Sequence, residues 1–501
     1  MEFFDHLQTG FSTAVSLQNL LYCFAGVTLG TLIGVLPGIG PAATVAMLLP
    51  LTFNLDAVSS LIMLSGIYYG AQYGGSTTAI LINLPGESSA VVTALDGHQM
   101  ARQGRAGPAL VTAALGSFFA GTVATLLLAV LSPPLSQLAL TFTSADYFAL
   151  MVVGLVGAVA LAKGSVINAL GMVVIGLLLG TTGQDIYTGL QRFTFGHLEL
   201  VDGIDFVAVA MGMFGLAEII RNLEGRGLQQ PAMRDAGRLW ITRQDLKAII
   251  MPVIRGTGLG SVLGALPGGG GTLSSFASYA LEKKLARDPS RFGKGAIEGV
   301  AGPESANNAG AQTSFIPMLT LGIPSNPTMA LMVGALIIQG ISPGPNVISE
   351  QPVLFWGVIA SMWIGNLMLV VLNLPLVGLW VKLLQVPYKV LFPGIVAFCC
   401  IGVYSLNNSS LDIYLMVIAG LAGYVFSKLD CEPAPLLLGL ILGPMLEEHF
   451  RRALLYSRGD FTVFVTNPVS GGLLLVALVA LVSVILPAVR SRREEAFKED
   501  A

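Results

Sequence analysis

Two long apolar segments of this chain are interrupted by residues that break helices. The interruptions are the runs Leu36 to Pro41 (LPGIGP) and Leu266 to Gly271 (LPGGGG). Proline and clustered glycine end or kink a helix and leave backbone N–H and C=O groups without partners. Inside a bilayer, such backbone is tolerated only where protein buries it or a water-filled cavity receives it. The two runs therefore predict a paired site inside a membrane protein.

The composition agrees with a polytopic membrane protein. Hydrophobic residues make up 54% of the 501 residues and charged residues only 11%, with a mean hydropathy of +0.75. In soluble domains, by contrast, about a quarter of the residues are charged. The net charge of -3 argues against nucleic acid as a partner. Because the four cysteines lack CxxC spacing, we expect buried thiols rather than a metal or redox site.

Seven residues around the first interruption recur at one constant spacing around the second. The matched positions are Gly26, Gly30, Gly34, Leu36, Pro37, Gly38 and Gly40, which align with Gly256, Gly260, Gly264, Leu266, Pro267, Gly268 and Gly270. No Lys or Arg precedes Arg102, whereas a basic cluster from Lys283 to Lys294 follows the second run. By the positive-inside rule, the first segment enters the membrane from outside and the second from the cytoplasm. This charge pattern is typical of an inverted repeat.

These patterns predict an all-α polytopic membrane protein with two inverted structural repeats, re-entrant hairpins, discontinuous helices and about 10–12 membrane segments. The first repeat is expected over 1–225, with a hairpin at 17–53, a broken helix at 58–95 and further spans. A cytoplasmic connector is expected over 226–245. The second repeat is expected over 246–450, with a hairpin at 246–285, a broken helix at 298–341 and further spans. Residues 451–501 are expected to form a C-terminal span and a cytoplasmic tail.

The distribution of basic residues predicts the orientation of the chain. The N-terminus carries no Lys or Arg and is predicted to be periplasmic, whereas Arg490, Arg492 and Arg493 place the C-terminus in the cytoplasm. One loop disagrees with this scheme, because Arg451 and Arg452 would be external. The further spans are expected near 108–131, 145–162, 165–181, 205–220, 353–381, 391–406, 411–427, 433–446 and 469–488.

Two more breaks follow the repeated runs, at Asn83 to Ser88 and at Gly322 to Thr328. A helix broken at membrane depth points free N–H groups toward an anion, and its free carbonyls can coordinate a cation. The four breaks therefore predict one substrate site near the bilayer midplane. The predicted substrate-binding residues are Pro37, Gly38, Gly40, Thr44, Pro85, Gly86, Ser88, Pro267, Gly268, Gly270, Thr272, Pro324, Ser325, Asn326 and Thr328. The structural alternative is that the breaks are kinks whose backbone is satisfied by Ser and Thr.

Carboxylates and amides beside the breaks are candidates for a cation site. The candidate residues are Ser76, Thr77, Glu87, Glu304, Asn307 and Asn308. An intramembrane carboxylate is costly and so is functional by default, although both carboxylates are equally consistent with capping a half-helix at an interface. We expect Na⁺ or H⁺ as the coupling ion and no other cofactor. No HExxH, Walker or GxSxG motif is present, so neither an enzyme nor a structural metal site is expected.

Four stretches resemble the large membrane subunit, TctA, of bacterial tripartite tricarboxylate transporters. They are GVTLGTLIGVLPGIGPAATVAMLLPLTF, YYGAQYGGSTTAILINLPGE, YTGLQRFTFG and PESANNAGAQTSFIPMLTLGIPSNPT. The resemblance implies a secondary transporter of carboxylates such as citrate in the bacterial inner membrane, driven by a cation gradient. It also implies two partners, a small membrane subunit (TctB-like) and a periplasmic solute-binding protein (TctC-like). The lipid bilayer surrounds the chain in either case.

Three functions compete at this point. The first is a cation-coupled carboxylate importer, or symporter, that receives its substrate from a binding protein. The second is a carboxylate carrier that works without a binding protein, or an anion channel. Channels usually rely on rings of symmetric ligands, so two unequal pairs of breaks favour a carrier. The third is a membrane scaffold, in which the breaks would matter only for stability.

Overall fold

The computed structural model describes residues 2–36, 39–83, 86–162, 165–224, 238–266, 270–383 and 388–485. Within these residues the chain is almost entirely helical, and its only strands are β1 (Gly183–Gln184) and β2 (Gln191–Arg192), which pair antiparallel. The described helices that are long and apolar enough to cross a membrane are Leu17–Gly34, Ala90–Ala139, Phe206–Glu224, Arg243–Gly264, Pro352–Asn373 and Ser410–Lys428. The predicted class, an all-α polytopic membrane protein, is confirmed.

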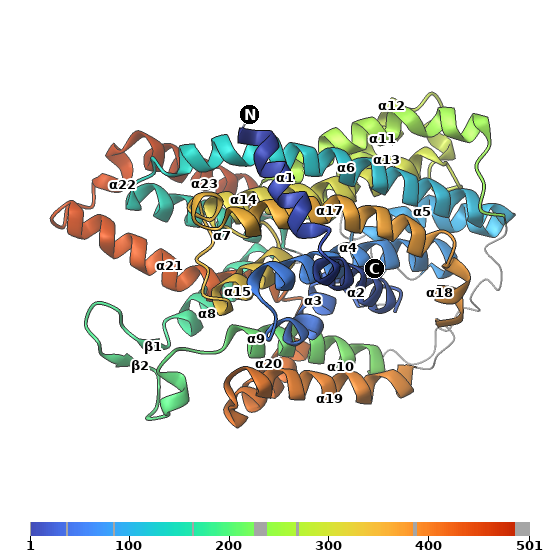
Figure 1. Cartoon of the computed structure of the whole chain (residues 1–501). Coiled ribbons are helices and arrows are strands. Elements are labelled where there is room, and N and C mark those ends of the chain that lie inside the picture. The colour runs from blue at the N-terminus through green and yellow to red at the C-terminus, as the bar shows by residue number, and fades with distance from the viewer. Residues whose placement is uncertain are drawn as a thin grey trace.

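A central bundle contains all four predicted breaks. It consists of α2 (Leu17–Gly34), α3 (Pro41–Leu48), α4 (Ala57–Ile82), α5 (Ala90–Met100), α6 (Ala106–Ala139), α11 (Arg243–Gly264), α12 (Gly270–Leu285), α13 (Glu298–Thr313), α14 (Phe315–Leu321), α15 (Pro327–Ile338) and α17 (Pro352–Asn373). The long helices α6, α11, α13 and α17 run in roughly the same direction across the molecule (Figure 1). Two of the breaks begin alike, because α4 and α14 each end before a left-handed residue, Asn83 (φ 57°) and Gly322 (φ 73°).

The repeated glycines bring two pairs of helices into backbone contact. Along α2, a Cβ added at Gly26, Gly30 or Gly34 would lie 2.3–2.4 Å from a carbonyl oxygen of α4, on Met63, Ile67 and Ala71 respectively. Along α11, a Cβ added at Gly256, Gly260 or Gly264 would lie 2.3 Å from the carbonyl oxygens of Gly302, Ala306 and Gly310 in α13. Small residues spaced four apart allow this close approach of membrane helices. The α2–α4 and α11–α13 pairs are therefore packed in the same way.

Further helices surround the bundle. They are α1 (Glu2–Ala14), α7 (Ser144–Leu161), α8 (Val166–Gly180), α9 (Phe206–Ala210), α10 (Ala217–Glu224), α16 (Val347–Glu350), α18 (Val377–Leu383), α19 (Tyr388–Asn407), α20 (Ser410–Lys428), α21 (Ala434–Tyr456), α22 (Val463–Thr466) and α23 (Pro468–Ile485). In Figure 1, α10, α19 and α20 form the lower layer, and α21 and α22 lie at the left. The sequence did not predict α1, which packs on α17 with His6 stacked on Trp356 (centroids 5.4 Å apart).

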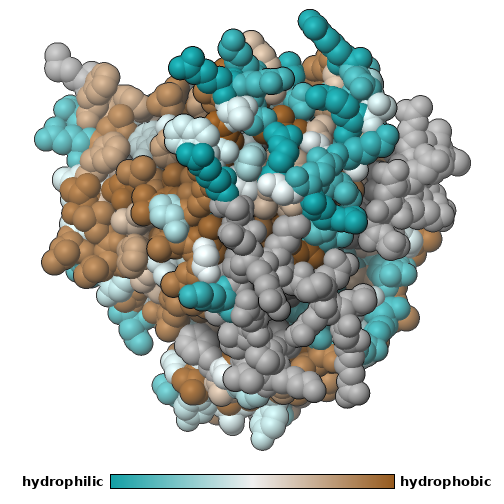
Figure 2. All heavy atoms as spheres, turned by 90° about the vertical axis from the view of Figure 1, so that its right-hand side faces the viewer, coloured by the Kyte–Doolittle hydropathy of each residue, from teal (hydrophilic) through white to brown (hydrophobic). Residues whose placement is uncertain are grey.

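Loops that share a charge pattern gather at the same end of the molecule. At one end, Arg105 pairs with Asp245 (2.6 Å), and the Gln103 side chain donates to the backbone carbonyl of Lys294 (2.8 Å). Figure 2 views this end, where hydrophilic residues gather beside apolar flanks. Loops without Lys or Arg also meet, because Ser136 donates to the carbonyl of Pro345 (2.5 Å). Residues 226–237 of the predicted connector (226–245) and the C-terminal arginines lie outside the described residues, and the end of the connector overlaps α11, which begins at Arg243.

Candidate functional site

The four breaks meet in pairs. A Cβ added at Gly40 would lie 3.6 Å from the carbonyl oxygen of Gly86, so the α2–α3 break touches the α4–α5 break. A Cβ added at Gly270 would lie 3.4 Å from the Cβ of Asn326, so the α11–α12 break touches the α14–α15 break. The remaining predicted residues at these tips, Pro37, Gly38, Pro85, Pro267 and Gly268, lie outside the described residues.

One amide joins the two pairs of breaks. The Asn307 side chain on α13 donates from Nδ2 to Oε1 of Glu87 (2.9 Å). Its Oδ1 is buried and has no hydrogen-bond partner among the described residues, and a Cβ added at Gly271 would lie 2.1 Å from it. A buried acceptor without a donor is costly. Asn307 therefore links the second break to the third and keeps one acceptor free at their junction.

The junction is partly accessible. Glu87, Ser88, Gly271, Thr272 and Asn326 all keep part of their surface exposed. The α3 helix that begins beside them has Pro41 at its first position, and its N-cap, Gly40, supplies no side-chain acceptor. Its first N–H groups are therefore not capped by a side chain and carry the positive end of the helix dipole. This arrangement can receive an anion.

Other predicted residues stabilise the breaks themselves. Asn326 is the N-cap of α15: its Oδ1 accepts from the Met329 N–H (2.9 Å), and its Nδ2 donates to Oγ of Ser314 (3.1 Å). Thr44 donates to the carbonyl of Gly40 (3.0 Å), and Ser325 donates to the carbonyl of Ser314 (3.5 Å). Pro324 and Thr328 are buried in the same turn. These contacts give each residue a structural role that the sequence pattern did not specify.

The second carboxylate, Glu304, is enclosed by hydroxyl groups. It is 1% exposed and accepts from Oγ of Ser76 (2.8 Å) on α4 and from Oγ1 of Thr93 on α5. Asn308, one turn further along α13, donates to Oγ of Ser117 on α6 (2.6 Å). Glu304 therefore ties α13 to α4 and α5 through neutral donors, with no basic side chain in contact.

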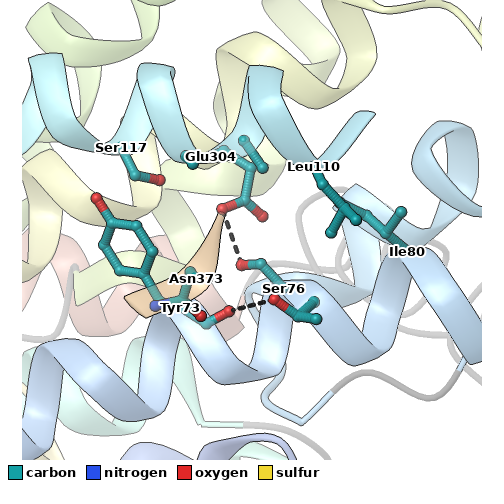
Figure 3. Close-up of a pocket in the computed structure, with 10 residues that line it drawn as sticks. Tyr73, Ser76, Ile80, Leu110, Ser117, Glu304 and Asn373 are labelled. Atoms are coloured by element: carbon teal, nitrogen blue, oxygen red, sulfur yellow. Dashed lines mark hydrogen bonds between the residues drawn. The ribbon is translucent and has the colours of Figure 1, made fainter. Parts of the chain in front are cut away.

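A small cavity lies beside Glu304 (Figure 3). Its volume is about 10 Å³, enough for a single water-sized particle. The lining residues are Tyr73, Ser76, Thr77, Ile80, Leu110, Ala113, Ala114, Ser117, Glu304 and Asn373. The structure thus places the two predicted carboxylates in separate environments, a partly open junction at Glu87 and a small cavity between helices at Glu304.

Comparison with known proteins identifies the chain. Residues 20–438 match the family model described as "Tripartite tricarboxylate transporter TctA family". The chain belongs to this TctA family. The predicted resemblance is confirmed, and family membership makes the protein a multi-pass membrane component of a tripartite tricarboxylate transporter.

Two relatives of this TctA protein come from Agrobacterium vitis. One is described as an uncharacterized 52.8 kDa protein in the TAR-I ttuC' 3' region. It is 63% identical over 500 residues, and the match covers 100% of both chains. The other, described as an uncharacterized protein in the TAR-II ttuC' 3' region, is 64% identical over 241 residues, which are 48% of this chain and all of that protein. No solved structure matches the chain.

Sequence reasoning did not include several polar residues of the candidate site among its predicted site residues. Thr93 bonds directly to Glu304, and Tyr73, Ser117 and Asn373 line the cavity. Each of them is a polar residue inside an apolar segment, and this is the sequence feature by which they could have been found. The predicted cation candidates divide in two: Ser76, Thr77, Glu304 and Asn308 lie at or beside the cavity, whereas Glu87 and Asn307 lie at the junction. No group of three or more acidic, His or Cys side chains suited to a metal occurs within the described residues.

Proposed function

We propose that this TctA protein imports a carboxylate, of the tricarboxylate type, across the bacterial inner membrane by symport with a cation. The observation that carries the proposal is the meeting of four helix breaks around Glu87 and Asn307. Broken helices provide free N–H groups and positive dipole ends, which suit the carboxylates of a substrate. Their free carbonyls suit a cation such as Na⁺. The substrate site lies at this junction.

The proposed architecture is two inverted repeats with re-entrant hairpins. The matching glycine contacts in α2–α4 and α11–α13 support a repeated unit. The opposite charges flanking the two hairpins support their opposite orientation. In this arrangement the end that carries Arg105 and Lys294 is cytoplasmic, and the N-terminus is periplasmic. One repeat unit moving against the other gives each side of the membrane access to the junction in turn.

A cation is part of the proposed mechanism for electrostatic reasons. A carboxylate substrate at the junction lies near Glu87, and like charges repel strongly where water is scarce. A proton or Na⁺ bound within the same helix bundle lowers the net negative charge around the substrate and so favours substrate binding. Since tight substrate binding then requires the cation, the cation gradient can drive uptake.

The proposed partners follow from family membership. A TctC-like periplasmic protein delivers the substrate, and a TctB-like small membrane subunit completes the complex. Exposed apolar side chains such as Ile254 (48% exposed) and Val262 (64%) on α11 face lipid or such a subunit.

Uptake by the reconstituted three-subunit complex tests the proposal. Proteoliposomes receive labelled citrate, or other labelled di- and tricarboxylates, with or without an imposed Na⁺ or pH gradient. We expect accumulation above the external concentration only with a gradient and with the binding protein present. Gradient-independent flux without accumulation would indicate an anion channel, and uptake without the binding protein would indicate an independent carrier. Either result contradicts the proposal.

A further inference from the structure

The cavity beside Glu304 has an unusual polar lining. Six of its lining residues present oxygen atoms: a phenol, three hydroxyls, a carboxylate and a side-chain amide carbonyl, from Tyr73, Ser76, Thr77, Ser117, Glu304 and Asn373. These residues come from α4, α6, α13 and α17 and surround one small space (Figure 3). The lining contains no Lys, Arg or His. Oxygen-only surroundings are those that hard metal cations prefer.

One of these oxygens lacks a donor. Asn373 is 4% exposed, and its Nδ2 donates to the carbonyl of Leu369 (3.0 Å). Its Oδ1 is buried and has no hydrogen-bond partner among the described residues. A buried acceptor of this kind is favourable only if something positive or hydrogen-donating reaches it. Asn373 therefore points independently to an occupant of the cavity.

Charge and size restrict that occupant. The lining carries one carboxylate, Glu304, and its other polar groups are neutral hydroxyls, a phenol and an amide, so a monovalent cation gives a neutral site. A divalent cation would leave an unbalanced positive charge in a buried place, which is costly. At about 10 Å³, the cavity has room for one water-sized particle and none for a hydration shell. Both limits favour a small, dehydrated, monovalent ion.

We propose that this cavity is a Na⁺ site, with the ion held by Glu304, Asn373 and the surrounding hydroxyls. The proposal rests on the cation-coupled function proposed above and assigns its ion to the cavity beside Glu304, apart from the Glu87 junction. Bound Na⁺ balances the negative charge of Glu304. It gives Oδ1 of Asn373 a positively charged partner. It also strengthens the contact of α13 with α4 and α6, whose side chains share the ion.

Na⁺ binding to the purified chain tests this proposal without substrate or partner subunits. Thermal unfolding in detergent is followed while NaCl replaces KCl or choline chloride at constant ionic strength, and ²²Na⁺ binding is measured in parallel. We expect saturable stabilisation by Na⁺ and not by K⁺. Glu304→Gln should weaken the apparent Na⁺ affinity by about tenfold to 100-fold, whereas Ser65→Ala, on α4 but outside the cavity lining, should retain it.

The outcomes separate this site from the transport proposal. No Na⁺ effect on the wild type, equal stabilisation by K⁺, or an unchanged effect in Glu304→Gln overturns the Na⁺ site. If Glu304→Gln does not fold, Asn373→Leu decides, because it removes one ligand and leaves the carboxylate; unchanged Na⁺ affinity in that variant overturns the proposal. Failure of carboxylate uptake by the complex would contradict the transport proposal and leave these binding results unaffected.

Discussion

The α2–α4 and α11–α13 pairs share their packing but differ in their polar residues. Gly30 meets the backbone of Ile67 in α4, and Gly260 meets the backbone of Ala306 in α13, each at 2.3 Å from an added Cβ. Counting from these contacts, α4 carries Ser65 and Tyr68 where α13 carries Glu304 and Asn307. The same backbone arrangement is therefore lined by aromatic groups in one half and by a carboxylate and amides in the other.

This difference indicates that the two helix pairs share their backbone contacts but not their chemistry. In α4, the rings of Tyr68 and Tyr69 pack near Phe315, with centroids 6.4 and 6.1 Å apart. In α13, the equivalent turn supplies Glu304 to the cavity and Asn307 to the junction. A fully symmetric pair would carry two cavities of this kind, with two buried carboxylates to neutralise. Because the two pairs differ, only the α11–α13 pair has a buried carboxylate of this kind to neutralise.

The largest effect should come from substitutions at the glycine contacts that the α2–α4 and α11–α13 pairs have in common. Gly30→Leu and Gly260→Leu each place a side chain where a carbonyl oxygen already lies, so the helices must separate. We expect a cost of about 3 kcal/mol or more and loss of folded protein in both variants. Fluorescence-detected gel filtration after membrane extraction measures the folded fraction.

Gly258→Leu is the matched control for the glycine contacts. It lies on α11 between the contact glycines, and an added Cβ there meets nothing within 4 Å. We expect normal folding of this variant. A normal elution profile for Gly260→Leu would contradict the packing seen between α11 and α13, and a normal profile for Gly30→Leu alone would show that the two pairs are not equivalent.

The next largest effect should come from a substitution that lowers uptake at α13 but not at the equivalent position of α4. Glu304→Gln removes the charge in α13, and we expect carboxylate uptake by the complex to fall by about 100-fold. Ser65→Ala changes the equivalent position in α4, where no carboxylate exists, and should stay within about twofold of the wild type. Initial uptake rates, normalised to folded protein, provide the measurement. Equal losses in both variants would mean that this position matters for packing in either half.

Much of this arrangement could be predicted from the sequence, because local patterns determine it. The glycines that recur at one constant spacing predicted that the two segments are alike, and Pro-Gly runs predicted the breaks, which lie between α2 and α3 and between α11 and α12. The partners of Glu304 could not be predicted. Thr93 bonds to it and Asn373 lines the same cavity, both from segments far away in the chain, and no sequence period encodes which face of α5 or α17 turns toward α13.

The two arginines that disagreed with the predicted topology, Arg451 and Arg452, lie in helix α21 and not in the expected loop. Arg451 pairs with Asp185 (2.9 Å) and Glu447 (2.7 Å), and Arg452 pairs with Glu448. The positive-inside rule counts Lys and Arg near the ends of spans, without regard to such local neutralisation. The side of the membrane on which these arginines lie stays a prediction, as does the orientation of the whole chain.

A smaller effect should come from the junction between the halves. Gly271→Ala places a methyl group 2.1 Å from Oδ1 of Asn307, so the amide must move and its bond to Glu87 weakens. We expect the variant to fold, because the Asn307 side chain can move aside, whereas a backbone carbonyl at a helix contact cannot. Uptake should fall by about tenfold. Gly258→Ala serves as the control on the same hairpin. Unchanged uptake kinetics in Gly271→Ala would remove Asn307 from the proposed site.

The smallest effect lies outside both halves, in the loop around Asp185. Bonds from the N–H groups of Thr188 and Tyr187 (2.9 Å each), together with Arg451, lower the pKa of Asp185 from 3.8 to about 2. Because the folded pKa is depressed, the stabilisation is present above about pH 4 and is lost as the pH falls toward 2. Asp185→Asn should lower the Tm by about 1–2 °C at pH 6, and the difference should shrink at pH 3. Asp5→Asn, at an exposed position near the N-terminus, should show no such trend. A difference between wild type and Asp185→Asn that stays constant from pH 6 to pH 3 would show that the loop is stabilised by its fold alone, without the ionised carboxylate.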